Sequence, residues 1–234
     1  MSAHYDVIAV GVGAMGSSTC RALARRGVRV LGIEQFDIPH ERGSSHGHSR
    51  MIRTAYYERP EYVPLLKRAF RQWREIESES NIPLLHVTGG LYIGRGDGGL
   101  VSESLASSRK YDLEPELLGH AELSRRYPQF RVPDDYVALL EANAGFLLPE
   151  LSIATQVALA EQHGATIHRN EPVLDWHAGS KSARVTTAQG TYESDELIFC
   201  GGAWSGKLLR DFDIPLVVTR QVLGWVQPLR PELF

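Results

Sequence analysis

The sequence is poor in the features that mark secreted, membrane-spanning or nucleic-acid-binding proteins. It has two cysteines, Cys20 and Cys200, which are too few for a disulfide framework and favour a reducing compartment. No apolar run approaches the roughly 20 residues that a helix needs to cross a bilayer. The net charge of −3 gives no reason to expect a nucleic acid or a membrane surface as a partner. The first apolar run begins close to Met1 and leaves no room for a signal peptide, so we predict a cytoplasmic protein.

The remaining composition is that of an ordinary globular protein. Hydrophobic residues make up 43% of the chain and charged residues 23%, and the length suffices for one large or two small domains. The histidines show no metal-ligand spacing, so no metal site is predicted.

A glycine-rich turn near the N-terminus is the first informative pattern. An apolar run of residues 5–10 enters the sequence Gly-Val-Gly-Ala-Met-Gly at Gly11, and a helix rich in small residues follows. Gly11 permits a tight turn, Gly13 lets the backbone approach a pyrophosphate, and Gly16 lets the helix pack closely on the strand. The first turn of the helix offers unpaired N–H groups and the positive end of its dipole to phosphates.

A second β-branched run, residues 28–33, ends at Glu34 and completes a βαβ unit. An acidic residue about 20 positions after the first glycine can accept hydrogen bonds from ribose hydroxyls, and its charge disfavours a 2′-phosphate. On these residues alone the ligand is NAD or FAD, and a glycine turn in a ligand-free protein is the alternative. Cys20 lies among the small residues of the helix and is predicted to serve packing.

The segment from Gly43 to Arg53 has no hydrophobic period and concentrates glycines, serines, histidines and arginines. We predict a loop that leads into a short strand or helix. A loop after the second strand of a nucleotide fold lies near the ligand crevice, although a solvated loop would have a similar composition. In a helix, Arg50 and Arg53 would address one anionic ligand together, and the planar guanidinium suits a carboxylate.

These residues resemble a known family. The segment Gly43–Arg53, after the fingerprint and Glu34, is similar to the flavin loop of the family of monomeric sarcosine oxidase and N-methyltryptophan oxidase. That family belongs to the D-amino-acid-oxidase-like FAD-dependent oxidoreductases. The similarity continues at Thr88–Leu91, Asn143–Ala165, Gly201–Trp204 and Arg220–Gly224. The resemblance implies that the cofactor is FAD.

The resemblance also implies the architecture. The expected fold class is α/β with an α+β second domain: a Rossmann-like FAD-binding domain with an inserted antiparallel-sheet substrate domain. We place the FAD-binding domain at residues 1–85 and 146–216, and the substrate domain at residues 86–145 and 217–234. Family members are longer than this chain, so the resemblance places beyond Phe234 part of the FAD-binding domain, a cysteine that binds FAD covalently and a lysine implicated in oxygen activation.

Site residues follow from the same resemblance. Arg53 would bind the substrate carboxylate, Arg50 would lie against the flavin ring, and His46 would set the polarity around it. A turn at Gly201 and Gly202 would cross close to FAD, with a simple strand-to-helix turn as the alternative. The implied cofactor-binding residues are Gly11, Gly13, Ala14, Met15, Gly16, Glu34, Gln35, Ser44, His46, Ser49, Arg50, Gly201, Gly202 and Trp204.

The implied function is that of an FAD-dependent oxidase of secondary amino acids, N-methylated or cyclic, such as sarcosine. The products would be an imine or aldehyde and hydrogen peroxide, the partners an amino acid and dioxygen, and the protein a monomer. Three alternatives stay open: a related FAD-dependent dehydrogenase or oxidase of the glycine or D-amino acid type, an NAD-dependent dehydrogenase, and an inactive nucleotide-binding fragment.

Hydrophobic periodicity predicts the remaining elements. Helices are expected at residues 61–77, 100–110, 121–127 and 149–163, and strands at residues 84–87, 90–93, 165–170, 172–178, 183–187, 190–193 and 195–199.

Overall fold

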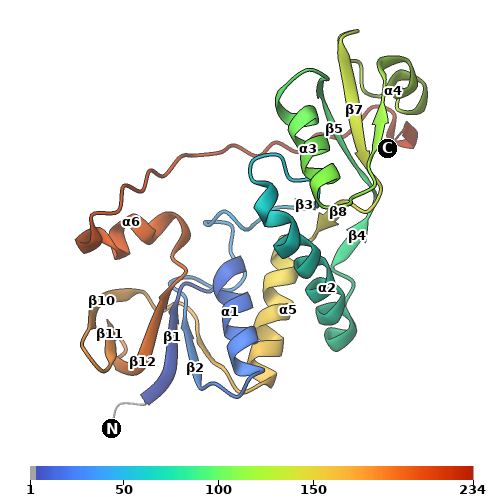
Figure 1. The fold of residues 1–234 in the computed structure, drawn as a ribbon. Coiled ribbons are helices and arrows are strands. Elements are labelled where there is room, and N and C mark those ends of the chain that lie inside the picture. The colour runs from blue at the N-terminus through green and yellow to red at the C-terminus, as the bar shows by residue number, and fades with distance from the viewer. Residues whose placement is uncertain (1–3, 234) are drawn as a thin grey trace. The chain divides into compact units, whose positions relative to one another are not determined.

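The computed structural model describes residues 4–233 and forms two compact units (Figure 1). Unit 1 comprises the chain up to Ser49 together with residues 148–222, and unit 2 comprises residues 50–147 with the chain from Leu223 onward. The first boundary therefore lies at Ser49, where the sequence-based division placed it at residue 85. Residues 50–85 join unit 2 because strands β3 (Arg50–Ile52) and β4 (Leu85–Val87) both pair with β8 (Gly145–Leu147).

Unit 1 is built on a six-stranded sheet in the order β10-β11-β12-β1-β2-β9. Its parallel part consists of β1 (His4–Val10), β2 (Val30–Ile33), β9 (Thr166–His168) and β12 (Thr191–Phe199). The strands β10 (Val173–Ala178) and β11 (Ala183–Thr187) join β12 in an antiparallel meander. Helix α1 (Ala14–Ala24) connects β1 to β2, so the predicted βαβ unit is confirmed.

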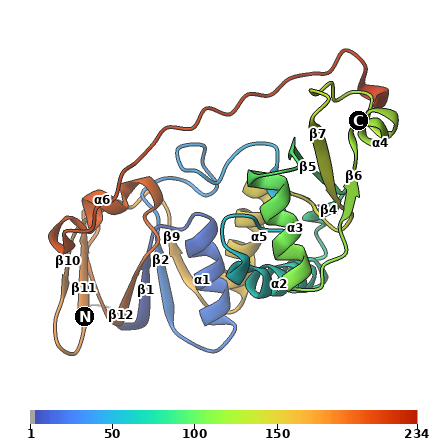
Figure 2. The same ribbon diagram turned by 45° about the horizontal axis from the view of Figure 1, so that its top comes forward.

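Two helices cover one face of this sheet. Helices α1 and α5 (Pro149–Gln162) lie side by side against it in both ribbon views (Figures 1 and 2). Cys20 of α1 packs with Ala9 of β1 and Val157 of α5 in the core between them. Because burial raises the pKa of the Cys20 thiol to about 12, this group stays protonated at neutral pH. The predicted packing role of Cys20 is confirmed.

The opposite face of the sheet is covered by the meander. Ile8 and Leu31 pack against Val185 of β11, with Trp176 of β10 at the edge of the same cluster. The prediction of two strands at residues 190–193 and 195–199 is wrong, because β12 continues without a break. Ser194 joins the two halves, since it pairs with β11 on one side and with β1 on the other.

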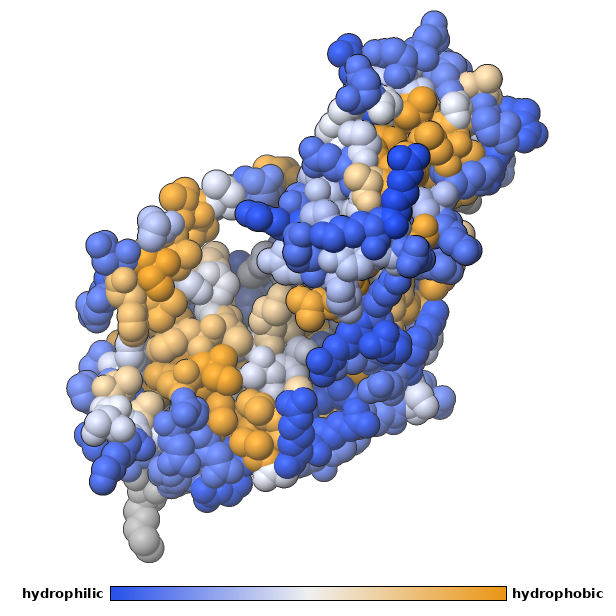
Figure 3. Space-filling model, viewed as in Figure 1, coloured by the Kyte–Doolittle hydropathy of each residue, from blue (hydrophilic) through white to orange (hydrophobic). Residues whose placement is uncertain are grey.

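Short helical turns follow β12. These are η2 (Gly202–Trp204), α6 (Ser205–Leu208) and η3 (Arg210–Phe212), and η4 (Pro231–Leu233) lies near the end of the chain. Hydrophobic side chains gather on the surface around α6 (Figure 3). Phe212, Ile214 and Leu216 are about half exposed. No helix within residues 4–233 has the length and hydrophobicity needed to cross a membrane.

Unit 2 contains a three-stranded antiparallel sheet between two helices. Its strands are β5 (Gly90–Arg95), β7 (Tyr136–Glu141) and β6 (Glu116–Leu118), with β7 in the centre. Alternate residues of β7 face the two sides: Leu139 packs in a cluster with Val101 of α3 (Gly99–Lys110), and Ala138 packs with Leu123 of α4 (His120–Arg126). The expected antiparallel sheet is confirmed.

A second three-stranded sheet of unit 2, β3-β8-β4, begins directly after the loop at residues 43–49. Of the two options for residues after that loop, the strand is confirmed, because Arg50–Ile52 pair with β8. Helix α2 (Val63–Ser80), preceded by η1 (Pro60–Tyr62), ends at Asn81 in the left-handed conformation. The predicted helices are confirmed to within a few residues at their ends.

Glu77 joins α2 to β4. Its Oε1 atom accepts hydrogen bonds from the backbone N–H groups of Leu84 (2.7 Å) and Leu85 (2.8 Å), and its Oε2 atom accepts one from Arg74 (2.6 Å). Burial of the side chain, which is 14% exposed, raises the pKa of Glu77, but these donors outweigh burial and hold the pKa below its ordinary value.

We expect Glu77→Gln to destabilise the protein by about 1–3 kcal/mol at neutral pH, because an amide N–H₂ would face backbone donors. A lowered folded-state pKa contributes stability above the unfolded-state pKa and loses it as the pH falls through the folded-state value. Urea unfolding of wild type and variant should therefore show a difference that shrinks below about pH 4. Glu103→Gln, on the exposed side of α3, is the control. A pH-independent difference would contradict the role of the Glu77 carboxylate.

Candidate functional site

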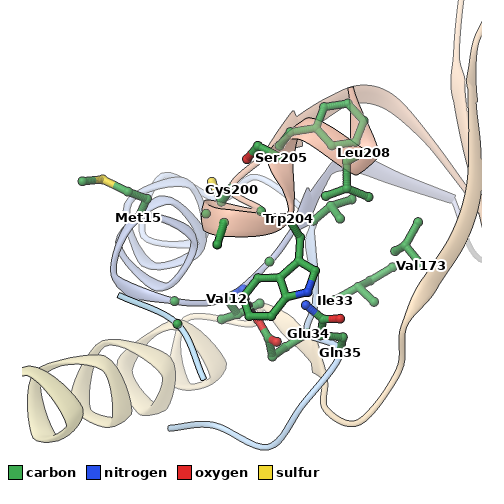
Figure 4. A pocket seen from close by; sticks show the side chains of 18 of the residues that line it. Val12, Met15, Ile33, Glu34, Gln35, Val173, Cys200, Trp204, Ser205 and Leu208 are labelled. Carbon is green, nitrogen blue, oxygen red and sulfur yellow. Dashed lines mark hydrogen bonds between the residues drawn. The ribbon is translucent and has the colours of Figure 1, made fainter. Parts of the chain in front are cut away.

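A cavity of about 400 Å³ lies at the carboxyl ends of the parallel strands in unit 1 (Figure 4). Val10, Ile33 and Phe199, the last residues of β1, β2 and β12, all contribute to its wall. The loops that follow these strands, together with the beginning of β10, complete the lining. Ligands of open α/β sheets bind outside this edge of the sheet, so the cavity is the candidate nucleotide site.

The glycine-rich turn has the form that a pyrophosphate requires. Gly11 has a φ angle of +93°, and a Cβ atom there would lie 2.5 Å from the Cys200 carbonyl oxygen. A Cβ atom on Gly16 would lie 1.9 Å from the Gly11 carbonyl oxygen, so Gly16 serves close packing of α1. At Gly13 a Cβ atom would meet no atom within 4 Å. The turn therefore leaves open space at Gly13, the N-cap of α1.

The N-terminus of α1 is suited to an anion. The N-cap residue, Gly13, has no side chain that could cap the helix, and the first turn of α1 contains no acidic residue. The N–H groups of this turn can therefore donate to a phosphate, and the helix dipole favours its negative charge. These residues fit an adenine dinucleotide.

Glu34 is buried at the end of β2, with 4% of its surface exposed. Its Oε2 atom accepts a hydrogen bond from the N–H of Val12 (2.8 Å), and Oε1 accepts one from the N–H of Phe36 (3.1 Å). A carboxylate offers about four lone-pair sites, so Glu34 can hold both loops and still accept a hydroxyl hydrogen bond. Its assignment to the ribose hydroxyls stays a prediction.

The wall beside Val173 was missed by the sequence analysis, which predicted the strand but no site residue on it. The backbone N–H groups of Asn170 and Glu171 donate to the carbonyl oxygens of Phe36 and Glu34, each at 2.9 Å. This pairing brings the residues before β10 to the loop after β2. A βαβ fingerprint gives no signal for such a contact, because the partners are far apart in the sequence.

Glu171 is part of this wall, and hydrogen bonds hold its side chain in place. Its carboxylate, in a residue 1% exposed, accepts hydrogen bonds from Thr187 Oγ1 (2.6 Å) and the Tyr192 hydroxyl (2.8 Å). Burial raises the pKa of Glu171, but its donors outweigh burial and hold it below the ordinary value. Burial and the Glu171 carboxylate together raise the pKa of Tyr192 to about 12, so its hydroxyl stays a donor.

The turn after β12 forms a further wall. A Cβ atom on Gly201 would lie 2.5 Å from Leu208 Cδ1, so a larger residue would require the Leu208 side chain to shift. The Trp204 ring packs edge-on against Phe36, with 5.5 Å between ring centroids. Burial raises the pKa of the Cys200 thiol, which makes it a poor nucleophile and supports the predicted packing role.

Most of the predicted cofactor residues line this cavity: Gly11, Gly13, Ala14, Met15, Glu34, Gln35, Ser44, Gly201, Gly202 and Trp204. Met15 is 75% exposed and points away from the other labelled side chains (Figure 4). Among the described residues, Gly16, His46, Ser49 and Arg50 are not part of the lining. The role of Gly16 is helix packing.

His46 orders the loop after β2. Its Nδ1 atom lies 2.6 Å from the carbonyl oxygen of Gly43, and the next residue, Gly47, donates its N–H to Glu150 Oε1 of α5 (3.0 Å). These two contacts fix the loop both to itself and to a helix. A direct role of His46 at the flavin stays a prediction.

Arg50 and Arg53 belong to unit 2. Arg50 begins β3, and residues three apart in an extended segment point to opposite sides, so the two arginines do not share a helical face. The Arg53 guanidinium lies over three tyrosine rings, with centroid distances of 5.1 Å to Tyr56, 5.4 Å to Tyr57 and 5.6 Å to Tyr92. Its Nη2 atom lies 3.7 Å from Glu58 Oε2.

Residues 4–233 contain no group of three or more histidine, cysteine, aspartate or glutamate side chains that could hold an ion.

The chain matches the family model DAO, described as FAD dependent oxidoreductase, over residues 6–233. It is 42% identical to monomeric sarcosine oxidase of Streptomyces avermitilis, over 99% of this chain and 62% of that protein. It is 40% identical to monomeric sarcosine oxidase of Bacillus sp. (strain B-0618), over 97% of this chain and 59% of that protein. It is 34% identical to N-methyl-L-tryptophan oxidase of Citrobacter koseri, over 95% of this chain and 59% of that protein. The chain thus spans about three fifths of these relatives.

Solved structures agree in fold. The open form of NikD, an unusual amino acid oxidase essential for nikkomycin biosynthesis, superposes with a TM-score of 0.80 and 29% identity, over 89% of this chain and 54% of that chain. L-proline dehydrogenase from P. horikoshii superposes with a TM-score of 0.78, over 94% of this chain and 58% of that chain. At 19% identity, this similarity supports the fold alone.

Two glycine variants separate cofactor contact from packing. We expect Gly13→Ala to fold like wild type and to bind FAD at least about tenfold more weakly, because the methyl group enters open space at the phosphate-binding turn. Gly16→Ala should lose both fold and FAD, because its methyl group collides with the Gly11 carbonyl. Thermal unfolding and FAD titration of the two variants check this. Unchanged FAD affinity in Gly13→Ala would place the pyrophosphate elsewhere.

Proposed function

Because this chain belongs to the DAO family of FAD-dependent oxidoreductases, we propose that the full-length protein is an FAD-dependent oxidase of secondary amino acids. The substrate class is N-methyl or cyclic amino acids such as sarcosine, which the names of its relatives support. The observation that carries the proposal is Arg53, a guanidinium held over three tyrosine rings and suited to a carboxylate.

Unit 1 would hold the FAD. The first turn of α1 would bind the pyrophosphate beside Gly13, and Glu34 would accept hydrogen bonds from the ribose. The start of β10 at Val173 and the ring of Trp204, which both line the cavity, would enclose the rest of the adenine nucleotide. When bound, the flavin supplies a two-electron acceptor that dioxygen reoxidises with release of hydrogen peroxide.

Arg53 would bind and orient the substrate carboxylate. Its contact with Glu58 is 3.7 Å long, which exceeds the roughly 2.7–2.9 Å of a charge-assisted hydrogen bond, and Glu58 is exposed. The guanidinium can therefore give two parallel N–H groups to a carboxylate. The tyrosine rings hold its plane, so little rotamer freedom is lost on binding. We also propose that Arg50 and His46 contribute to the surroundings of the flavin.

The substrate nitrogen must be unprotonated before the adjacent C–H bond is oxidised. The positive charge of Arg53 beside the carboxylate disfavours a second positive charge on the nearby amine. Activity should therefore increase with pH as the free amine becomes populated. The names of the relatives support a monomer, and the composition of the chain supports a cytoplasmic location.

The oxidase reaction is tested directly by peroxide release from the full-length protein. We expect it to carry a yellow flavin and to release hydrogen peroxide with at least one of sarcosine, N-methyltryptophan and pipecolate, and less with glycine. Flavin reduction by these amines without peroxide would instead identify a dehydrogenase. A protein that binds no flavin would overturn the proposal.

Arg53→Lys should lower kcat/KM for the amino acid about 100-fold, because the lysine ammonium cannot make the two parallel hydrogen bonds to a carboxylate. FAD content should stay at the wild-type level. Steady-state kinetics and flavin absorbance measure the two effects, with Arg59→Ala, an exposed arginine six residues on, as the control. A parallel loss of flavin content and amine affinity would argue that Arg53 supports the fold or the cofactor.

A further inference from the structure

Arg53, the proposed substrate-binding arginine of unit 2, is followed in the chain by two residues whose backbone N–H groups donate to Glu141, a buried carboxylate at the end of β7. We infer that Glu141 is a positioning residue that fixes Arg53 for the substrate carboxylate. This inference rests on the proposed function, since it gives Glu141 a part in recognising the same substrate group. In this role Glu141 acts through Arg53 and takes no direct part in the reaction.

Glu141 accepts four hydrogen bonds with its two carboxylate oxygens. Oε1 accepts one from the N–H of Thr54 (2.7 Å) and another from the hydroxyl of Thr54. Oε2 accepts one from the N–H of Ala55 (3.0 Å) and another from the hydroxyl of Tyr92 (2.6 Å). The residue is 6% exposed, so water does not compete strongly for these donors.

The donors are the groups that determine where the Arg53 side chain lies. Thr54 and Ala55 directly follow Arg53, so their two backbone hydrogen bonds fix the chain on its carboxyl side. Tyr92 supplies one of the three rings beneath the guanidinium, 5.6 Å from Arg53 Cζ. Burial and the Glu141 carboxylate both raise the pKa of Tyr92, so its hydroxyl remains a donor. Glu141 therefore fixes both the backbone beside Arg53 and a ring on which it rests.

Both sides of Arg53 are anchored to sheets. On the amino side, Arg50–Ile52 pair with β8. On the carboxyl side, Glu141 is the last residue of β7 and pairs with Gly90 of β5. Gly90 itself has no room for a side chain, since a Cβ atom would lie 2.9 Å from Ala144 Cβ. A carboxylate on so rigid a support restricts the guanidinium more than a loop residue would.

Glu141 and Glu58 act differently on Arg53. Glu58 is exposed and approaches the guanidinium directly, so a substrate carboxylate can displace it. The oxygens of Glu141 are occupied by backbone and hydroxyl donors. Glu141 can therefore hold Arg53 in place without competing for the N–H groups that the substrate needs.

Glu141→Gln is the most direct test because it keeps the size of the side chain. One amide position becomes an N–H₂ group, which would face the N–H of Thr54 or of Ala55. Hydroxyl groups can rotate to accept from this N–H₂ group, but a backbone N–H cannot. At least one backbone donor beside Arg53 thus loses its acceptor, and the arginine is released from its position.

The full-length, FAD-loaded protein is titrated with acetate, a carboxylate without an amine, and the change in flavin absorbance gives Kd. We expect Glu141→Gln to raise the Kd for acetate and the KM for sarcosine roughly 10- to 100-fold, with a smaller change in kcat. Glu77→Gln is the matched control, since it removes a partly buried carboxylate that also accepts two backbone N–H groups in unit 2. It should lower the unfolding temperature but leave Kd and KM unchanged.

A double-mutant cycle separates positioning from general destabilisation. In an Arg53→Lys background, Glu141→Gln should raise the Kd for acetate less than about threefold, because the group that it positions is already gone. Effects of the two substitutions that multiply independently would overturn the inference. So would a Glu141→Gln protein that binds acetate like wild type.

Two outcomes distinguish this inference from the proposed function. If wild type neither binds acetate nor oxidises an amine, the proposed function fails. If wild type does both and Glu141→Gln is unchanged, the inference alone fails. Should Glu141→Gln not fold, Tyr92→Phe decides, because it keeps the ring and removes one hydrogen bond to Glu141: a Kd for acetate raised at least about threefold supports positioning, and an unchanged Kd overturns it.

Discussion

The carboxylate of Glu34 holds together the parts of unit 1 on which a cofactor site depends. It accepts the N–H of Val12 from the glycine turn and the N–H of Phe36 from the loop after β2. Through its backbone, Glu34 also accepts the N–H of Glu171, which brings the beginning of β10 to the same edge. Three loops with no regular structure of their own are thus fixed by one buried residue. A loop fixed in this way can present backbone N–H groups at a constant position, which binding of a dinucleotide requires.

Carboxylates that accept several hydrogen bonds occur in both units. Glu171 in the wall of the cavity, Glu77 at the junction of α2 and β4, and Glu141 near Arg53 each accept hydrogen bonds from several donors, with Glu171 and Glu141 buried and Glu77 partly buried. Burying a carboxylate is costly unless such donors compensate it, so each of these residues restricts the positions of the groups around it. Glu171 and Glu141 apply this restriction beside the proposed ligand sites, whereas Glu77 applies it to the packing of α2 on β4.

The units divide the proposed work between them. Unit 1 has a cavity bounded by glycines at a helix N-terminus, which suits the phosphates and ribose of FAD. Unit 2 has an arginine over aromatic rings, which suits the carboxylate of an amino acid. Membership of the DAO family connects these features, because its relatives are named as oxidases of sarcosine and of N-methyl-L-tryptophan. The proposed reaction needs both features together.

The sequence by itself determined the features that depend on near neighbours along the chain. The glycine spacing, the β-branched runs and Glu34 predicted the βαβ unit, and periodicity predicted the helices, because each signal is contained in a few turns or one strand. The tertiary structure alone decided the rest. It showed that Gly13 faces open space whereas Gly16 packs α1, and that β12 continues through Ser194. It also brought Glu141 to Thr54, although 87 residues separate them, because β3, which precedes Thr54, pairs with β8, which follows Glu141. Such contacts depend on strand pairing and burial between distant segments, and local periodicity carries no record of them.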